Sequence, residues 1–296
     1  MSDGPNDRTA ASVRQLLLNL AQTRNEDYNF VLTRYASERF LYRLSRSAHR
    51  AELILKGAML FQLWSESPHR ATKDLDLLAS GDVSKEAIAS KLLAICAIDV
   101  EMDGLLFDTS ALIVSDISED DRYVGVRAKF VAKLGSAKIA MQIDFGVGDA
   151  VTPAPMETKY PTLLEMPHPV IFAYPRETVV AEKLEAIVDL GMDNSRMKDY
   201  FDLWFIATTY PDDSETLALA VQRTFARRQQ DLPQEVPIGL SNEFARDPAK
   251  QLQWEAFLAR AIGASLSLAD AVSEVRVFAM PVFAMASTSL GFGGES

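Results

Sequence analysis

Two adjacent runs of alternating apolar and polar residues, at 123–134 and 139–147, constrain the fold most strongly. Side chains alternate between the two faces of a β-strand, so each run places its apolar residues on one face. These residues are Val124, Val126, Ala128, Phe130 and Ala132 in the first run, and Ile139, Met141, Ile143, Phe145 and Val147 in the second. Gly135 and Ser136 supply a turn between the runs. The pattern predicts a β-hairpin with one buried face.

Shorter patterns predict the remaining elements. Strands are expected at 52–56 and 73–79, because both runs are short, apolar and bounded by turn residues. Helical periodicity predicts helices at 10–25, 28–46, 58–64, 84–97, 175–190, 196–209, 214–229, 248–262 and 268–280. A proline-rich connector at 153–169 separates the sheet-forming half from a helical remainder. We therefore expect an α+β fold, with a first domain at 1–160 and a mainly helical lobe at 161–296.

The charge balance limits the partners of the chain. Its 296 residues contain 30 Lys and Arg against 41 Asp and Glu, a formal net charge of −11. Phosphate binding requires cations, so this balance excludes a protein that coats nucleic acid with its whole surface but allows a local basic patch. The single cysteine, Cys96, lies in an apolar run and is interpreted as a packing residue. With no secretory signal and no run of about eighteen apolar residues, we expect a cytoplasmic protein without a membrane span.

Three carboxylates are candidates for a metal site. Asp74 and Asp76 lie two residues apart in a predicted strand, so both point to one face while Leu75 and Leu77 point into the core. Two carboxylates this close repel unless a cation offsets their charge, and Mg²⁺ prefers such oxygen ligands. Asp144 projects from the polar face of the second hairpin strand, which can lie beside the first. A solvated strand face is the alternative interpretation of the D-x-D pattern.

The segment Lys56-Gly57-Ala58 lies between a predicted strand and a predicted helix. A glycine turn before a helix N-terminus exposes backbone N–H groups that can bind phosphate. Together with the two aspartates of the D-x-D strand and Asp144, this turn indicates a site for metal-dependent attack on an α-phosphate. We prefer this functional interpretation to the solvated strand face.

Lys183 and Asp199 lie on the apolar faces of two predicted helices. Lys183 is three residues after Val180 and four before Ile187, and Asp199 is four residues before Leu203. A buried ammonium group needs a counter-charge, so Lys183 either extends its head to solvent or reaches a phosphate or a carboxylate. Two interpretations stay open: an ion pair with Asp199 that joins the helices, or a lysine that binds phosphate.

A set of arginines forms the candidate basic patch. Arg39, Arg43, Arg46 and Arg50 recur at i, i+4, i+7 and i+11, which would place them on one helix face. Such a face could bind RNA, and a merely solvated face is the alternative.

Four motifs, in this order along the chain, resemble those of the AbiEii/AbiGii nucleotidyltransferase toxins. They are LILKGAMLFQLW at 53–64, RATKDLDLL at 70–78, MQIDF at 141–145, and YPRETVVAEKLEAIVDLG with SRMKDYFDL at 174–191 and 195–203. The resemblance covers about residues 12–285. It implies a nucleotidyltransferase-like core with a mixed β-sheet flanked by helices, a helical C-terminal lobe, Mg²⁺-dependent transfer of a nucleoside monophosphate, and pairing with an antitoxin in a type IV toxin–antitoxin or abortive-infection system.

The resemblance also implies a role for individual residues. They are Gly57 as the phosphate-turn glycine, Thr72 as the hydroxyl beside the metal ligands Asp74 and Asp76, Asp144 as the third acidic strand position, Lys183 as the nucleotide-contacting lysine, and Asp199 as an essential acid. At Ala58 and Met59 the chain lacks the second glycine and the hydroxyl that relatives often carry, so we expect one phosphate contact to be lost or moved.

The expected function is transfer of NMP from an NTP to an RNA acceptor, the 3′ end of a tRNA, by a toxin. Asp74 and Asp76 would hold Mg²⁺, and Asp144, near the metal, would help to activate the attacking hydroxyl. Lys183 would neutralise triphosphate charge, and Asp199 would hold Lys183 or orient the substrate. The alternatives are an acceptor that is a small molecule or a protein side chain, and a non-catalytic protein that binds a nucleotide or a partner.

Overall fold

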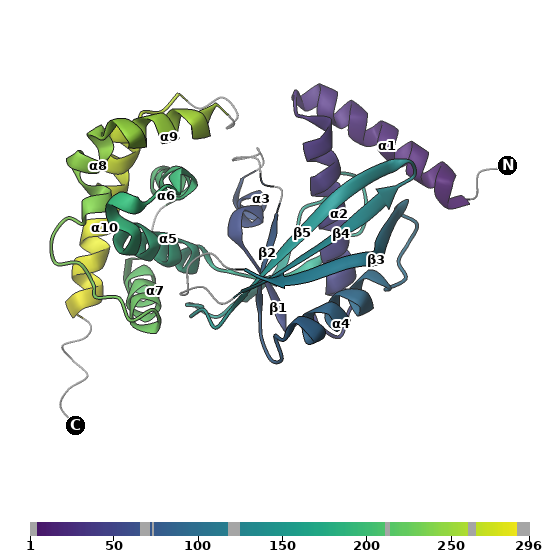
Figure 1. Ribbon diagram of the computed structural model, residues 1–296, viewed down its shortest axis with the longest axis horizontal. Coiled ribbons are helices and arrows are strands. Elements are labelled where there is room, and N and C mark those ends of the chain that lie inside the picture. The colour runs from purple at the N-terminus through teal and green to yellow at the C-terminus, as the bar shows by residue number, and fades with distance from the viewer. Residues whose placement is uncertain are drawn as a thin grey trace. The chain divides into compact units, whose positions relative to one another are not determined.

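The computed structural model describes residues 5–65, 72, 74–117, 125–210, 214–259 and 265–288 (Figure 1). The chain divides into two compact units, of which the first contains Met1–Gly148 and Met156–Ala173. The second contains Asp149–Pro155 and Tyr174–Ser296. The boundary expected after residue 160 thus falls inside the first unit, and the chain passes from one unit to the other three times.

A seven-stranded mixed sheet forms the centre of the first unit, in the order β3-β4-β5-β2-β1-β7-β6. Adjacent strands are antiparallel except for two parallel pairs, β2 with β5 and β1 with β7. The strands are β1 (Leu53–Lys56), β2 (Leu75–Ala79), β3 (Leu105–Asp116), β4 (Gly125–Leu134), β5 (Ala137–Val147), β6 (Met156–Lys159) and β7 (Val170–Ala173). The α+β class with a mixed sheet is therefore confirmed.

The predicted hairpin is present as β4 and β5, which pair in register from Gly125 with Gly146 to Leu134 with Ala137. Tyr123, Val124 and Lys73, which also belong to predicted strands, lie outside the described residues. Three strands were not predicted. In β3 the ladder shifts register between Asp108 and Ile113, which interrupts the alternation on which the sequence prediction depends. Strands β6 and β7 have four residues each; β6 lies inside the proline-rich connector and β7 directly follows it.

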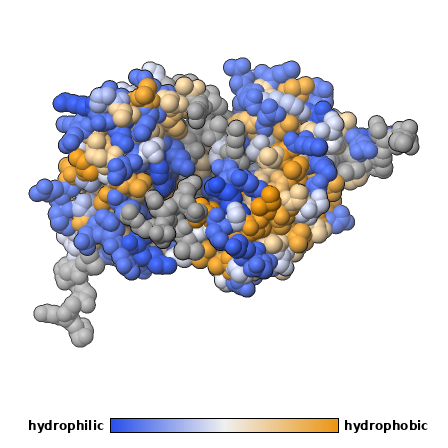
Figure 2. All heavy atoms as spheres, viewed as in Figure 1, coloured by the Kyte–Doolittle hydropathy of each residue, from blue (hydrophilic) through white to orange (hydrophobic). Residues whose placement is uncertain are grey.

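Strand β3 forms one edge of the sheet. Leu106 and Ile113 on this strand expose 57% and 63% of their surface, so the edge carries apolar side chains outside the core. Figure 2 shows hydrophobic side chains gathered on the visible face of the sheet-containing unit and bordered by hydrophilic ones.

Helices of the first unit pack on the sheet. They are α1 (Pro5–Arg24), α2 (Tyr28–Ser45) and α4 (Lys85–Cys96), with a 3₁₀ turn η1 (Gly57–Leu60) and the single α-helical turn α3 (Phe61–Trp64) where one helix was expected at 58–64. Asp27 caps the N-terminus of helix α2, because its carboxylate accepts a hydrogen bond from the Phe30 N–H. Phe40 of α2 contacts Phe107 of β3 and Phe130 of β4 at centroid distances of 6.0 and 6.4 Å, which joins the helix to the sheet.

The second unit is helical. Its elements are α5 (Arg176–Leu190), η2 (Gly191–Asp193), α6 (Met197–Thr209), α7 (Ser214–Arg227), η3 (Ile238–Leu240), α8 (Asn242–Arg246), α9 (Pro248–Leu258) and α10 (Leu268–Thr288). Helix α5 packs against α7, and α10 packs against α6 and α7. The Phe225 and Phe283 rings meet between α7 and α10 at 5.7 Å. The Thr178 hydroxyl of α5 donates to the Thr152 carbonyl and accepts from its N–H, which fixes the segment Asp149–Pro155 to this unit.

No helix in the described ranges is both long and apolar enough to cross a membrane. Cys96 is half-buried, and burial raises the pKa of its thiol to about 12, in agreement with a packing role.

The predicted arginine face is wrong, because two of its four members are buried and a third lies outside the helix. Arg39 and Arg43 are buried, with 1% and 5% of their surface exposed, and both bind the buried Asp103 carboxylate. Arg43 Nη1 donates to Asp103 Oδ2 at 2.7 Å, and Arg39 Nε donates to the same oxygen at 3.3 Å. Helix α2 ends at Ser45, so Arg50 does not continue the helix face. Charge spacing alone cannot reveal this, because the counter-charge comes from a loop about sixty residues away.

Arg46 and Arg50 remain at the surface. Arg46 is exposed, and Arg50 is half-buried, with its guanidinium paired to Glu157 and hydrogen-bonded to the Val170 carbonyl at 2.7 Å. A basic patch for RNA can therefore include Arg46, whereas Arg39 and Arg43 belong to the core.

We predict that Asp103→Ala destabilises the protein by about 3–5 kcal/mol, because it leaves two buried guanidinium groups without their carboxylate. Urea unfolding followed by circular dichroism measures this. Asp116→Ala is the matched control, since Asp116 forms an exposed ion pair with Lys85 and its loss should change stability little. Equal losses in the two variants would contradict the structural role of the buried cluster.

Candidate functional site

Four charged residues lie in register across four neighbouring strands of the first unit. Lys56 of β1 pairs with Asp76 of β2, Asp76 pairs with Asp144 of β5, and Asp144 pairs with Arg127 of β4. Paired residues share a face of the sheet and neighbouring strands are about 4.8 Å apart, so these side chains form one row. The row has the charge order positive, negative, negative, positive.

The D-x-D pattern takes the predicted strand geometry from Leu75 onward, and Asp74 lies outside the strand. Leu75 and Leu77 are fully buried, while Asp76 between them is half-buried, and Asp74 is half-buried directly before β2 begins. Thr72 lies beside this pair, because its hydroxyl donates to the Asp74 carbonyl at 3.4 Å. Thr72, Asp74 and Asp76 therefore lie close together along one stretch of chain.

Gly57 lies directly under the Asp76 carboxylate. Its φ of +72° is in the left-handed region that disfavours other residues. A Cβ atom at this position would lie 2.0 Å from Asp76 Oδ2 and 2.8 Å from Asp76 Cβ. The glycine is thus required both by its backbone conformation and by the close approach of a carboxylate. This contact adds a steric reason for Gly57 to the phosphate-turn role expected from the sequence.

The Asp144 carboxylate is bound by Arg127, which the sequence analysis did not single out. Arg127 Nε donates to Asp144 Oδ1 at 2.8 Å and Nη2 donates to Oδ2 at 2.7 Å, a two-point pair between half-buried side chains. Gln142 Nε2 lies 3.5 Å from Oδ2. The available signal was the hairpin register, which places Arg127 opposite Asp144.

The residues present fit a divalent cation at Asp74 and Asp76. Their carboxylates supply the oxygen ligands that Mg²⁺ prefers, and Gly57 leaves the space beside Asp76 free of a Cβ atom. Within the described ranges, no three His, Cys, Asp or Glu side chains are grouped closely enough to hold a metal ion. Asp144 is instead occupied by Arg127, so the third predicted metal ligand has an arginine partner, while Asp74 and Asp76 lie two residues apart at the start of β2.

A second charged cluster lies in the helical unit. Lys183 Nζ of α5 binds Asp199 Oδ1 at 2.6 Å and Asp202 Oδ2 at 2.9 Å, and both aspartates of α6 are fully buried. Arg196 Nε lies 2.7 Å from Asp199 Oδ2. The ion pair that joins two helices, one of the two interpretations left open by the sequence, is therefore present.

Burial of Asp199 acts to raise its pKa, but Lys183 and Arg196 outweigh this, so the pKa lies below its usual value. The sequence analysis missed Asp202 and Arg196. Each lies three residues from Asp199, and Asp202 follows it by less than one helical turn, on the same side of α6.

The predicted site residues belong to two units. Gly57, Thr72, Asp74, Asp76 and Asp144 lie in the sheet-containing unit, and Lys183 and Asp199 lie in the helical unit. The contacts described above are all made within one unit: those of the charged row within the sheet-containing unit, and those of Lys183 and Asp199 within the helical unit.

Comparisons with known proteins indicate the family. Residues 39–275 match the family described as "Nucleotidyl transferase AbiEii toxin, Type IV TA system". The chain is similar to the crystal structure of JHP933 from Helicobacter pylori, at 14% identity and a TM-score of 0.47, over 87% of this chain and 94% of that one. It is also similar to a candidate nucleotidyltransferase of H. pylori, at 16% identity and a TM-score of 0.44, over 85% and 93% of the two chains. No curated protein has significant sequence similarity to the chain.

Gly57→Ala should destabilise the protein more than Gly81→Ala does. Both glycines have a positive φ, +72° and +76°, so both substitutions carry a backbone cost of about 1–3 kcal/mol. Only Gly57→Ala adds the clash with Asp76, since a Cβ at Gly81 meets no atom within 4 Å. Thermal unfolding of the two variants measures the difference. Equal shifts in Tm would show that Asp76 does not lie over Gly57.

Lys183→Met should destabilise the protein by about 3–5 kcal/mol, because Asp199 and Asp202 stay buried without their ammonium partner. Since the Asp199 pKa is lowered in the folded state, its ion pairs contribute stability at neutral pH, and this is lost as the pH falls below about 4. Urea unfolding at pH 7 and pH 3 measures both effects. Lys198→Met is the control, because it removes an exposed lysine next to Asp199 and should change the free energy of unfolding little. An equally large loss of stability in Lys198→Met would argue against the buried cluster.

Proposed function

Because the chain belongs to the AbiEii family of nucleotidyltransferase toxins of type IV toxin–antitoxin systems, we propose that it transfers NMP from an NTP to an RNA 3′ end, that of a tRNA. The observation that carries this proposal is the row of Lys56, Asp76, Asp144 and Arg127 beside the Gly57 turn. The row places two carboxylates and two cationic side chains next to a glycine turn. The cationic side chains suit the phosphates of a nucleotide, and the carboxylates suit the metal ion that accompanies it.

The proposed reaction is an in-line displacement at the α-phosphorus. The 3′-hydroxyl oxygen forms a new bond to this phosphorus while the α–β phosphoanhydride bond breaks, and pyrophosphate leaves with the bonding electrons. The hydroxyl proton passes to a carboxylate of the site. Positioning and charge neutralisation supply most of the rate, so the side chains serve mainly to hold the groups in line.

Asp74 and Asp76 are the residues that would hold Mg²⁺. When bound, the ion would neutralise phosphate charge and favour ionisation of the attacking hydroxyl. Asp144 would contribute a third carboxylate and help to activate the hydroxyl. Both its oxygens pair with Arg127, so this role requires Asp144 to exchange the arginine for substrate or cation.

Lys183 would neutralise triphosphate charge, and Asp199 would hold Lys183. The contact of 2.6 Å between their charged groups supports the second of these roles directly. A lysine with 13% of its side chain exposed retains access to a phosphate oxygen while its carboxylate partners fix its position.

An antitoxin is the expected macromolecular partner, because the family acts in a toxin–antitoxin system. Among the surface arginines described above, Arg46 is the one with an exposed side chain that could contact RNA. The acidic net charge of −11 favours such a confined contact over a broad RNA-binding surface.

We expect Asp76→Asn to lower label transfer from α-labelled NTP to tRNA by at least about 100-fold, because an amide cannot replace a carboxylate ligand in charge. Purified protein is incubated with Mg²⁺, each of the four α-labelled NTPs in turn, and total tRNA. Asp116→Asn, an exposed aspartate on edge strand β3, should retain full transfer. Undiminished transfer by Asp76→Asn would refute the site.

The same incubation with protein or small-molecule acceptors separates the alternatives. Label in tRNA supports the proposal, and label confined to another acceptor would replace tRNA as the substrate while leaving the site assignment intact. No label with any acceptor would favour a protein that binds nucleotides or a partner without turnover.

A further inference from the structure

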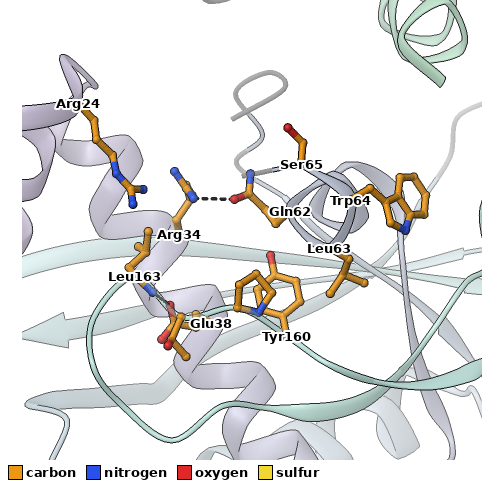
Figure 3. Close-up of a pocket in the computed structure, with 11 residues that line it drawn as sticks. Arg24, Arg34, Glu38, Gln62, Leu63, Trp64, Ser65, Tyr160 and Leu163 are labelled. Carbon is orange, nitrogen blue, oxygen red and sulfur yellow. Dashed lines mark hydrogen bonds between the residues drawn. The ribbon is translucent and has the colours of Figure 1, made fainter. Parts of the chain in front are cut away.

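A pocket of about 250 Å³ lies within the sheet-containing unit, apart from the charged row described above (Figure 3). Its walls come from the end of α1, from α2, from α3, and from the segment 160–163 before β7. Helix α3 directly continues the Gly57 turn through η1, and the Tyr160 hydroxyl donates to the Met59 carbonyl of η1 at 3.3 Å. The pocket therefore shares its framework with the glycine turn of the candidate site.

Gln62 presents an amide donor to this pocket. Its Oε1 accepts from Arg34 Nη2 at 2.6 Å, a contact drawn in Figure 3. The same contact fixes the orientation of the side-chain amide, and in the described part of the chain its Nε2 donates no hydrogen bond. A half-buried amide held in one orientation with its donor unused is suited to a ligand that carries an acceptor.

Glu38 presents a buried acceptor to the same pocket. Only 2% of Glu38 is exposed, and its Oε2 accepts from the Leu163 N–H at 2.7 Å. Its Oε1 accepts no hydrogen bond from any described group and lies 3.5 Å from Arg39 Nη1. Burial raises the pKa of this carboxyl group to about 7. This oxygen is paired electrostatically with Arg39 but accepts no hydrogen bond within the described residues, and a ligand N–H would supply one.

Two arginines give the pocket a positive charge. Arg34 is paired with Glu26 at 3.0 Å, so its charge is largely compensated. Arg24, at the end of α1, is exposed and has neither an ion pair nor a hydrogen bond among the described residues. Arg24 is thus the cation that can receive an anion at this pocket.

The ligand that fits must carry an acceptor for Gln62, an N–H donor for Glu38, and an anionic group for Arg24. A nucleobase edge carries a hydrogen-bond acceptor next to a donor, and the attached phosphate supplies the anion. The volume is below the range of about 300–1,000 Å³ typical of drug-sized ligands, which suits one base rather than an oligonucleotide. The aromatic side chains of Tyr160 and Trp64 also line the pocket.

We propose that this pocket binds a single nucleotide, with its base at Gln62 and Glu38 and its phosphate at Arg24. The proposal rests on the proposed function for the source of the nucleotide, which is the terminal residue of the acceptor RNA, because the charged row is assigned to the phosphates of the NTP.

The test measures binding without turnover. Adenosine, guanosine, cytidine and uridine 5′-monophosphates, radiolabelled, are dialysed to equilibrium against the full-length Asp76→Asn protein in the absence of divalent metal. In this background Gln62→Leu should raise the Kd of the best-bound nucleotide about 5-fold, because it removes one hydrogen bond. Arg24→Gln should raise the Kd of this nucleotide about 10-fold at low salt and reduce the salt dependence of binding.

Two controls locate the site. Gln15→Leu changes an exposed glutamine of α1 in the same unit and should leave the affinity unchanged. Of the three tryptophans, Trp64 lines the pocket, whereas Trp204 and Trp254 belong to the helical unit. Quenching of tryptophan fluorescence by the nucleotide should therefore disappear in Trp64→Phe and persist in Trp204→Phe. Unchanged affinity in both Gln62→Leu and Arg24→Gln, or no binding of any of the four nucleotides, would overturn the proposal.

Steady-state transfer by the otherwise unaltered protein then tests this source. Because the acceptor base is assigned to the pocket, Gln62→Leu should raise the KM for tRNA and leave the KM for NTP unchanged. The reverse result would contradict the assignment to the acceptor. A protein that binds nucleotides at the pocket but transfers no label would retain this proposal and refute the proposed function, so the two failures are distinguishable.

Discussion

The parallel pairing of β2 with β5 sets Asp76 beside Asp144, and this juxtaposition of two carboxylates governs the arrangement around it. Like charges directly opposite one another on a sheet are destabilising. The neighbouring strands bring a cation to each end of the pair, Lys56 on β1 and Arg127 on β4. The two positive and two negative charges of the row therefore sum to zero, although each position carries a charge. A phosphate that binds at one end, or a cation that binds near the carboxylates, changes the local charge.

The backbone at Gly57 passes very close to the Asp76 carboxylate of this row. The turn between β1 and η1 passes so near Asp76 that a side chain at position 57 would overlap the carboxylate. A backbone that close can bring its N–H groups to whatever the carboxylate binds. The steric requirement and the expected phosphate contact thus concern the same few atoms.

The buried ion pairs of the two units show how sequence patterns for charge can be misinterpreted. In the first unit, helical spacing predicted a basic surface, yet Arg39 and Arg43 point into the core because Asp103 meets them there. In the second unit, the position of Lys183 on an apolar stripe indicated either a counter-charge or a head that extends to solvent, and the structure contains the counter-charge Asp199. The difference is that an apolar stripe reports burial, whereas a charge period reports only which residues share a face.

Much of the fold was predictable for a similar reason. The hairpin, the D-x-D strand and most long helices of the second unit have strong periodicity, and these elements were predicted within a few residues of their observed bounds. Helix α10 is the exception, since it was expected to end at residue 280 but continues through Pro281 to Thr288. Strands β3, β6 and β7 were not predicted, because a register shift interrupts the first and the other two are too short to show alternation. Arg127 was missed because its importance depends on strand register rather than on any local motif.

The three passages of the chain between its units have a practical consequence for dissecting the protein. Neither unit is a continuous stretch of sequence, because Asp149–Pro155 is fixed to α5 and the chain then returns to add β6 and β7 beside β1. A fragment that ends at residue 160 lacks β7, so β1 and β6 lose the strand that joins them and β1 presents an open edge. The sheet-containing unit can be isolated intact only if residues 161–173 are retained, and the connecting segment 149–155 must then be carried along or replaced by a linker.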